Sequence, residues 1–344
     1  MDNPSETSRR KNEHIRINLE EDVRSGISTG LDGYHFWHNA LPEIDLDDID
    51  TSVDFLGKKV SVPILISSMT GGTEDAQRIN RNLAVNAEKF KLAMGVGSQR
   101  AGLEDESSIK TFKVRDYAPS ILLFANLGAI QLNYGYTVEH CQRAVDSIGA
   151  DALILHLNPL QEALMVNGDT RFSGLLKKIE HICRKIRVPV VVKEVGWGIN
   201  AQTVKYLVEA GVKVIDVAGA GGTSWSEVEK HRMKDEDDQK VASAFKDWGN
   251  PTAECIIEIH EKLGDVPIIA SGGLRDGIDI AKCVALGASL GGIARPFLLA
   301  AAESGETLER KISIMHRQIE LVMFATGSLN ITALQNNKIH KIAL

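Results

Sequence analysis

Two glycine pairs near the carboxyl end of the chain are the residues whose types and spacing most clearly predict chemistry. The pairs are Gly272 with Gly273 and Gly291 with Gly292, each after a short apolar run, and Arg295 follows the second pair. Glycine lets a backbone approach an anion closely, and a helix that begins after such a turn points free N–H groups at it. Arg295 would add a bidentate phosphate contact. We therefore expect a phosphate site here, although a glycine pair alone could be only a tight turn.

Lys193 is the next residue of chemical interest, because it continues a wholly apolar run and a buried amine needs an anionic partner. That partner could be an internal carboxylate, Glu194 or Asp216. If the phosphate belongs to flavin mononucleotide (FMN), Lys193 could instead hold the negative charge of the reduced flavin ring. Three polar residues that follow other apolar runs would then hydrogen-bond the polar edge of the ring: Thr70, Ser98 and Asn126.

Glu162 is a single carboxylate beside Gln161, with no second acidic ligand nearby in the sequence. Magnesium commonly binds through one or two carboxylates together with substrate phosphates and waters, so Glu162 could hold a magnesium and diphosphate complex. It could equally be an acid that complements a helix dipole. His156, six residues earlier, would more often be a histidine satisfied within the core.

The basic segment 9–14 is the one chemical feature of the N-terminal region. A solvated basic tail on a disordered start is the more usual interpretation of such a segment. The sharper alternative is a basic arm that folds over an anionic substrate. The acidic run 45–54 predicts a solvated loop or face.

Short apolar runs separated by helical stretches predict repeated βα units from residue 60 onward. Such continuous apolar strands suit a sheet covered on both faces, and eight in series indicate a closed (βα)8 TIM barrel, an α/β fold. The expected strands are 62–66, 92–96, 121–125, 152–155, 190–192, 214–217, 268–270 and 290–293.

Three regions follow from this pattern: an N-terminal extension 1–59, a barrel 60–328 with its last helix at 308–324, and a C-terminal tail 329–344. The interval after the sixth strand is about twice as long as the others. We expect residues 219–250 to form a long inserted loop, and loops of that length are usually lids or binding segments.

Polar side chains follow most of the expected strands directly, at the end of a barrel where enzymes of this fold keep their chemistry. Serine, threonine and asparagine at such points are usually turn or cap residues when taken singly. Their occurrence at strand after strand favours a site, and the segments concerned are 67–72, 97–100, 126, 156–162, 193–194 and 223–225.

Composition bounds the class of protein. The chain has 344 residues, of which 43% are hydrophobic and 25% charged, with a formal net charge of −7. An acidic balance argues against nucleic acid as the main partner. No run is long and apolar enough for a membrane span or a signal peptide, so we expect a cytoplasmic protein without a membrane partner. Cys141, Cys183, Cys255 and Cys283 lack metal-type spacing and are expected to be buried free thiols.

Several of these motifs, in this order, resemble those of the type 2 isopentenyl diphosphate isomerases. They are Arg10 and Lys11 with His14, the segments 68–72, 97–100, 156–162 and 193–196, and Gly272 and Gly273 with Ala294 and Arg295. The resemblance covers about residues 9–334, and the segment 156–162 is its most specific part. The insert around 229–248 and the C-terminal tail have no clear counterpart.

The resemblance implies a βα barrel that holds reduced FMN, with NADPH as the usual reductant and magnesium bound with the substrate diphosphate. The implied reaction moves a double bond between isopentenyl and dimethylallyl diphosphate without net redox. By motif, the FMN contacts would be Ser67, Ser68, Met69, Thr70, Ser98, Asn126, Lys193, Thr223, Gly272, Gly273, Arg275, Ala294 and Arg295. The substrate contacts would be Arg10, Lys11, Ser98, Gln99, Arg100, Asn158 and Gln161.

The same resemblance places magnesium on Glu162 and implies catalytic roles for Gln161, His156 and Lys193. Allylic protons are very weakly acidic, so an ordinary side-chain acid is badly matched to this chemistry, whereas an electron-rich reduced flavin could shuttle the proton. Trp225 could wall off the prenyl group or simply pack as part of a lid. The family is usually a homotetramer or larger.

Two other classes remain open from the sequence. A flavin oxidoreductase of the hydroxy-acid-oxidising kind would share the barrel and the lysine. That class places a catalytic histidine near the end of its sixth-strand region, whereas 218–223 contains none and His231 lies further on in the insert. The other class, a non-catalytic flavin-binding sensor, is disfavoured by the polar residues at so many strand ends.

Overall fold

A closed barrel of eight parallel strands forms the centre of the computed structural model, which describes residues 6–337 and 339–342. Neighbouring strands follow chain order, and pairing of β11 with β4 closes the barrel. The strands are β4 (Ile64–Ile66), β5 (Ala93–Gly95), β6 (Leu123–Gly128), β7 (Ala152–His156), β8 (Val190–Lys193), β9 (Val214–Asp216), β10 (Ile268–Ser271) and β11 (Leu290–Ile293). The predicted (βα)8 fold is confirmed, and each strand overlaps its expected segment.

The inside of the barrel is a packed core. One cluster of buried apolar side chains takes members from all eight strands, among them Leu65, Phe124 and Ile269. Phe55 and Val60 join this cluster from a hairpin of β2 (Val53–Phe55) and β3 (Lys58–Val60). Because this hairpin precedes β4, it lies against the ends where strands begin. The polar residues after each strand therefore gather at the opposite end, which we call the mouth.

Amphipathic helices surround the barrel because their apolar sides must be buried against the strands. Those around the barrel wall are α2 (Glu74–Phe90), α4 (Val138–Ile148), α6 (Leu175–Lys185), α7 (Ala201–Glu209), α10 (Thr252–Leu263), α11 (Gly277–Ala285), α12 (Arg295–Glu303) and α13 (Gly305–Thr326). The expected last helix is α13, longer at both ends than predicted. Short helical segments follow three strands: α3 (Arg100–Glu104) with η3 (Glu106–Phe112), η4 (Ala129–Tyr134) and α5 (Pro159–Leu164).

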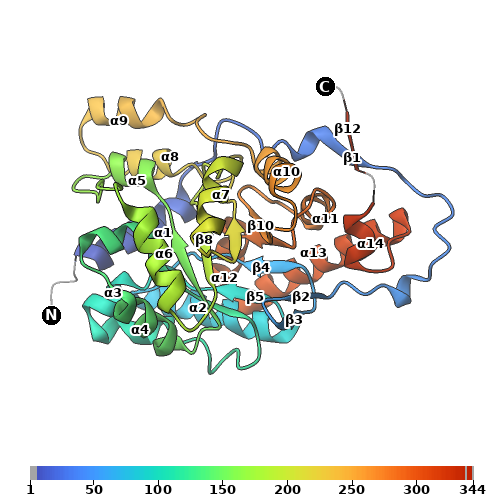
Figure 1. The fold of residues 1–344 in the computed structure, drawn as a ribbon, viewed down its shortest axis with the longest axis horizontal. Coiled ribbons are helices and arrows are strands. Elements are labelled where there is room, and N and C mark those ends of the chain that lie inside the picture. The colour runs from blue at the N-terminus through green and yellow to red at the C-terminus, as the bar shows by residue number, and fades with distance from the viewer. Residues whose placement is uncertain (1–5, 338, 343–344) are drawn as a thin grey trace.

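The N-terminal extension is more ordered than its sequence predicts. It contains α1 (Glu6–Glu20), η1 (Leu31–Gly33), β1 (Tyr34–Phe36) and η2 (Leu46–Asp48). The interpretation of 9–14 as a disordered tail is wrong, because these residues lie in α1, which buries Ile17. In the tail, α14 (Ile331–Gln335) leads to β12 (Ile339–Lys341), which pairs antiparallel with β1 (Figure 1).

The insert after β9 is helical, and the prediction of one long loop is wrong. It contains α8 (Trp225–Lys230) and α9 (Glu236–Ser243), and α8 packs against α5 (Figure 1). The side chain of Asp235 caps α9 by accepting from the N–H groups of Asp237 and Asp238. These helices are too short and too polar to show a helical apolar period.

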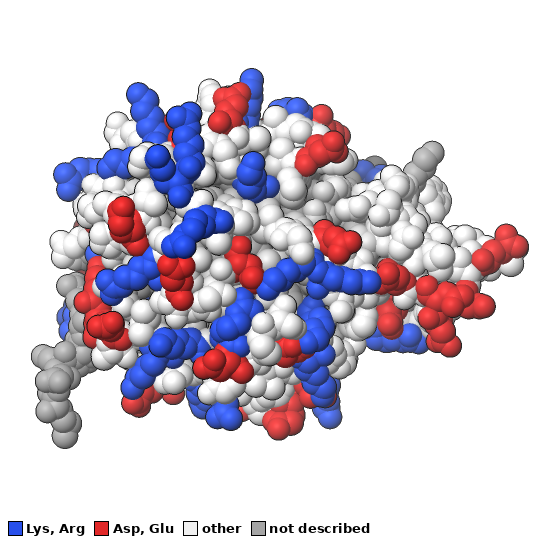
Figure 2. Space-filling model, turned by 60° about the horizontal axis from the view of Figure 1, so that its bottom comes forward, with Lys and Arg blue, Asp and Glu red and all other residues white. Residues whose placement is uncertain are grey.

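Charged side chains of both signs are mixed over the visible face in Figure 2, and acidic ones gather at the end formed by the loop between β1 and β2. Asp45, Asp47, Asp48 and Asp50 are exposed there, which confirms the predicted solvated acidic loop.

The four cysteines are free, and three are buried while Cys183 is half-buried. Burial raises the pKa of Cys141 to about 12, so this thiol is inert at neutral pH. Among the described residues, no helix combines the length and the apolar character that crossing a membrane requires.

Candidate active site

Three hydroxyl groups after β4 are the first sign of a ligand at the mouth. The Oγ atoms of Ser67 and Ser68 and the Oγ1 atom of Thr70 are buried and have no hydrogen-bond partner within the described chain. Buried polar groups are normally partnered. Glycines leave the room that these hydroxyls occupy: a Cβ on Gly95 would lie 2.4 Å from Ser68 Oγ, and one on Gly292 would lie 2.7 Å from Ser67 Oγ. Three neighbouring buried hydroxyl groups without partners indicate a polar ligand that forms hydrogen bonds with them.

The two glycine pairs do not play the same part. Gly272 and Gly273 have φ angles of +104° and +78°, and a Cβ on Gly272 would lie 2.1 Å from the carbonyl oxygen of Gly219. This pair is therefore required by close approach to the loop after β9. Gly291 and Gly292 lie inside strand β11, as the expected strand 290–293 predicted, so they do not form the second strand-to-helix turn that the glycine pair also suggested.

The N-terminus of α12 offers a place for a phosphate. Its first residue follows β11 directly, and Ala294 at the N-cap is exposed and gives no side-chain cap in the described structure. By contrast, α11 is capped by Asp276, whose side chain accepts from Asp279 N–H. The free N–H groups of an uncapped helix terminus attract an anion.

The two arginines assigned to this region have other partners. Arg295 donates from Nε to the carbonyl oxygen of Asn18 at 2.9 Å and from Nη2 to that of Glu21 at 3.1 Å, so its guanidinium ties down the end of α1. Arg275 is paired with Asp279 and Asp32, each at 2.8 Å, and its side chain is exposed. The structure therefore favours main-chain rather than guanidinium contacts to an anion here.

Lys193 sits at the end of β8 and is buried. Its Nζ donates to the carbonyl oxygen of Glu194, and within residues 6–337 and 339–342 it forms no ion pair with either nearby carboxylate. The Glu194 carboxylate turns away and accepts from the N–H groups of the three residues that follow it. Asp216 Oδ1 accepts from Ser271 Oγ at 2.6 Å, and burial raises the pKa of Asp216. The internal ion pair that the sequence allowed is absent, which leaves the Lys193 ammonium for a ligand.

His156 and Asn126 form a neutral pair in the mouth. His156 Nδ1 lies 2.9 Å from Asn126 Oδ1. Burial, with the nearby Lys193, Lys11 and Arg10, lowers the pKa of His156 to about 3. The imidazole is therefore neutral near pH 7, and it contacts the Asn126 side chain in that form.

Helix α1 carries the basic segment to the mouth. Lys11 Nζ donates to the carbonyl oxygen of Ser98 at 2.7 Å and lies 4.8 Å from the centre of the Phe112 ring. Burial and the neighbouring Arg10 lower the pKa of Lys11 to about 7. Arg10 Nη1 lies 3.9 Å from Met165 Sδ, beside α5. The basic arm expected as the sharper alternative thus lies over the mouth.

Glu229 on α8 joins three parts of the chain, and the sequence analysis assigned it no role. Gln161 Nε2 donates to Glu229 Oε1 at 3.0 Å, His14 Nε2 lies 3.0 Å from the same oxygen, and Arg232 pairs with Oε2. Burial opposes the charge of Glu229, but these three partners outweigh it and lower its pKa to about 2. His14 also packs edge-on against the Trp225 ring at 5.1 Å.

Glu162 has both carboxylate oxygens oriented. Oε1 accepts from Asn158 Nδ2 at 2.9 Å, and Oε2 accepts from the N–H of Asp169 at 2.7 Å. Asn158 Nδ2 also lies 3.2 Å from Gln161 Oε1. In the part of the chain that the structure describes, no group of three or more His, Cys, Asp or Glu side chains could hold a metal ion.

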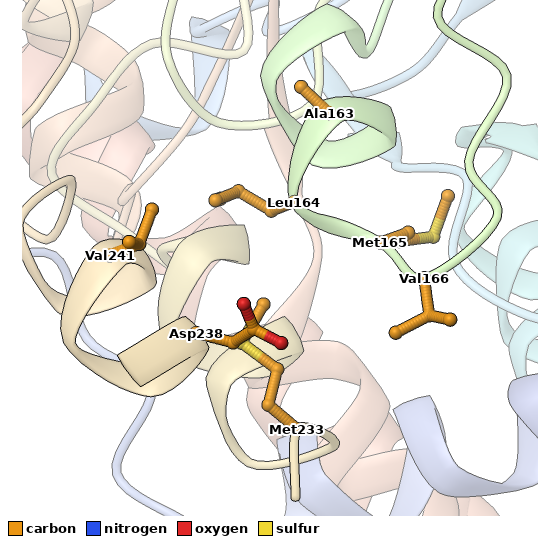
Figure 3. A pocket seen from close by; sticks show the side chains of 7 residues that line it. All are labelled: Ala163, Leu164, Met165, Val166, Met233, Asp238 and Val241. Carbon is orange, nitrogen blue, oxygen red and sulfur yellow. The ribbon is translucent and has the colours of Figure 1, made fainter. Parts of the chain in front are cut away.

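Two surface cavities lie outside the mouth. One, of about 240 Å³, lies between α5 and α9 (Figure 3). It is lined by Ala163, Leu164, Met165, Val166, Met233, Asp238 and Val241. The other, of about 510 Å³, lies between the segments that follow β7 and β8 and the end of the insert, beside Glu194 and Trp197. Neither cavity is lined by a residue predicted to contact FMN, substrate or metal, although Leu157, Pro159, Leu160 and Glu194 of the predicted strand-end segments line the second.

Comparison with known proteins decides between the candidate families. The sequence model of the FMN-dependent dehydrogenase family matches residues 142–341. The isopentenyl-diphosphate delta-isomerase of Nostoc sp. is 52% identical over 97% of this chain and 95% of the relative. The chain belongs to this isomerase family. The isopentenyl-diphosphate delta-isomerase of Oceanobacillus iheyensis is 47% identical over 96% of the chain and 95% of the relative.

Solved structures share the barrel of this isomerase at low sequence identity. A lactate oxidase of Pediococcus acidilactici has a TM-score of 0.68 and 15% identity, covering 96% of this chain and 87% of that one. A mandelate oxidase has a TM-score of 0.68 and 16% identity, covering 98% of each. At such identity these structures show the fold alone. The alternative of a hydroxy-acid oxidase is less well supported than the isomerase.

The isomerase presents groups that fit FMN. The three orphaned hydroxyls could bond the polar edge of its ring, Lys193 could pair with ring charge, and the uncapped terminus of α12 could receive its phosphate. Asn126, Ser98 and Thr223 lie on the strand ends or loops around the same mouth, and Met69 is half-buried beside Thr70.

Gln99 is the predicted substrate contact that the isomerase structure does not bring to the mouth surface. Its side chain is buried, donates to the carbonyl oxygen of Ala144 at 2.8 Å, and accepts from Asn126 N–H at 2.9 Å. Gln99 thus supports Asn126 from behind. The sequence misled because Gln99 stands between Ser98 and Arg100, which are only half-buried, whereas Gln99 is buried.

Proposed function

We propose that this isomerase interconverts isopentenyl diphosphate and dimethylallyl diphosphate, with FMN held reduced by NADPH and magnesium bound with the diphosphate. The observation that supports the proposal is that two groups of residues able to bind anions lie at one mouth. One is the uncapped start of α12, and the other is formed by Arg10, Lys11 and the Asn158–Glu162 segment. A flavin phosphate and a substrate diphosphate would need two such regions.

The first region would hold FMN. Main-chain N–H groups at Gly272, Gly273, Ala294 and Arg295 would receive its phosphate, and Ser67, Ser68 and Thr70 would bond its ring. Lys193, freed from internal carboxylates, would balance charge on the reduced ring. Reduced FMN supplies an electron-rich ring with an exchangeable proton, so a double bond can move without net oxidation.

The second region would hold the diphosphate. Arg10 and Lys11 bring positive charge from α1, and Arg100 brings it from the start of α3. Glu162, oriented by Asn158, would bind magnesium together with the substrate diphosphate. One protein carboxylate suffices, because phosphate oxygens and water complete the shell of magnesium.

Gln161 would position the reacting end of the substrate. Both polar atoms of its amide are hydrogen-bonded, because Nε2 donates to Glu229 Oε1 and Oε1 accepts from Asn158 Nδ2. Trp225 and His14, packed together over this point, would exclude water from the prenyl group. The neutral His156 would orient Asn126 without exchanging a proton itself.

Assembly forms a separate part of the proposal. We infer a homotetramer or a larger oligomer, in line with the family resemblance. Light scattering on the FMN-loaded protein tests this inference, and full activity at the monomer mass would overturn it.

The proposed reaction is tested by identifying the product under anaerobic conditions. With FMN, NADPH and magnesium present, the enzyme should convert isopentenyl diphosphate to dimethylallyl diphosphate, and Gln161→Ala should slow conversion by roughly a hundredfold or more while FMN stays bound. Lactate and mandelate, offered aerobically, should not be oxidised. Oxidation of either acid without isomerisation would return the assignment to the hydroxy-acid oxidases.

A further inference from the structure

A tight turn after α5 folds back onto Glu162. Asn167 has a φ of +59°, and a Cβ on Gly168 would lie 1.9 Å from the carbonyl oxygen of Glu162. A side chain at position 168 would clash with that backbone, so glycine is required for the turn to close. The turn therefore delivers the next residue, Asp169, to the side of the Glu162 carboxylate.

Asp169 contacts residues from three short helical segments, α5, α3 and η4. Its N–H donates to Glu162 Oε2 at 2.7 Å, while its Oδ2 accepts from Arg100 Nη1 at 3.0 Å and from Gln131 Nε2 at 3.0 Å. Its side chain is only 17% exposed. Gln131 is buried and follows β6, so it anchors the Asp169 carboxylate to the barrel.

Arg100 and Glu162 each have one further polar partner, and the two partners are different residues. Arg100 Nε donates to Glu104 Oε1 at 2.7 Å, and Glu162 Oε1 accepts from Asn158 at 2.9 Å. Asp169 touches both the guanidinium and the carboxylate. An arginine side chain has a large rotamer entropy, and a charge-assisted contact that fixes it also fixes where its remaining donors point.

We propose that Asp169 is a positioning residue that couples Arg100 to Glu162, so that diphosphate and magnesium bind as one unit. This inference rests on the proposed function, in which Arg100 meets the diphosphate and Glu162 the metal. Asp169 itself touches neither ligand. Its side chain holds the Arg100 guanidinium, and its main-chain N–H holds the Glu162 carboxylate. Gln131 fixes the position of the Asp169 side chain.

The test measures binding of inorganic diphosphate to the FMN-loaded enzyme by calorimetry, with and without magnesium. The ratio of the two Kd values is the magnesium enhancement. Asp169→Ala removes both side-chain contacts and frees the turn, so it should weaken diphosphate binding without magnesium and also lower the magnesium enhancement, each by about tenfold. Asp169→Asn keeps an uncharged acceptor and should give a smaller loss of both.

Glu104→Ala is the matched control, since it removes the other carboxylate on Arg100 without touching Glu162. It should weaken diphosphate binding but leave the magnesium enhancement unchanged. A purely structural role for Asp169 would lower the thermal midpoint and FMN binding while the enhancement stayed at the wild-type value. That result in Asp169→Ala, or in Asp169→Asn if the alanine variant does not fold, overturns the coupling.

Glu162→Gln separates this inference from the function on which it rests. If Glu162→Gln abolishes the magnesium enhancement and Asp169→Ala does not change it, the coupling alone is wrong. If neither variant changes the enhancement, or if the wild-type enzyme shows none, magnesium does not bind through Glu162 and the proposed metal role fails first. Loss of the enhancement in both variants, with Glu104→Ala unaffected, supports the coupling.

Discussion

At the scale of single residues, Glu229 joins His14, Gln161 and Arg232 at the mouth, and sequence reasoning left it without a role. It lies on a short helix of the insert, so no apolar period marks it, and its partners His14 and Gln161 come from distant segments. Only its i,i+3 pairing with Arg232 is visible in the sequence.

We expect Glu229→Gln to weaken the attachment of helix α1 to the mouth, because Glu229 contacts His14. The pKa of Glu229 is lowered from 4.5 to about 2, so the folded state favours the charged carboxylate. This preference contributes about 3 kcal/mol to the free energy of unfolding at neutral pH, and the contribution is lost as the pH falls from about 4.5 through about 2. The variant should therefore unfold at a lower temperature and bind substrate more weakly, as measured by calorimetry and KM. Glu20→Gln, on the exposed side of α1, is the control and should change neither.

Lys11 gives a prediction on pH dependence. In the free enzyme its pKa is about 7, below the ordinary 10.5, so the ammonium is charged below about pH 7 and neutral above it. Since kcat/KM reports groups of the free enzyme, it should fall about tenfold for each pH unit above this pKa. Lys11→Arg should move the fall to higher pH, because arginine stays charged. An identical profile in the variant would remove Lys11 from diphosphate binding.

At the scale of elements, the sequence predicted the barrel strands well and the helices that cover the mouth poorly. Most barrel strands are short, mainly apolar runs that are buried on both sides, so their pattern is easy to recognise. The helices α1, α8 and α9 are polar, and their positions depend on contacts between distant segments. The sequence placed Gly291 and Gly292 both in the expected strand 290–293 and in a turn, and the structure keeps them in the strand, where the lack of a Cβ at Gly291 lets Ile280 approach.

The link between α12 and α1 can be tested through Arg295. Because its guanidinium holds the carbonyl groups of Asn18 and Glu21, Arg295→Ala should release the end of α1, lower the thermal midpoint and raise the substrate KM several-fold. FMN affinity should change much less, since the phosphate is assigned to main-chain N–H groups. Loss of FMN with an unchanged KM would place the guanidinium on the phosphate instead.

At the scale of the whole molecule, the chain closes one end of the barrel and leaves its chemistry at the other. The β2–β3 hairpin seals the end where strands begin, and α1 with the insert covers the mouth. The N-terminal extension and the C-terminal tail meet as β1 and β12, although the sequence placed them in separate regions. Such pairing between distant ends has no local sequence signal, because it depends on how the whole chain folds.

The central claim is that this mouth isomerises a prenyl diphosphate without consuming reducing equivalents. It is tested most directly by counting NADPH oxidised against dimethylallyl diphosphate formed, in the absence of oxygen and with a trace of FMN-loaded enzyme. The account predicts many product molecules for each NADPH, because the reduced flavin is needed but not spent. One NADPH consumed for each product molecule would contradict it.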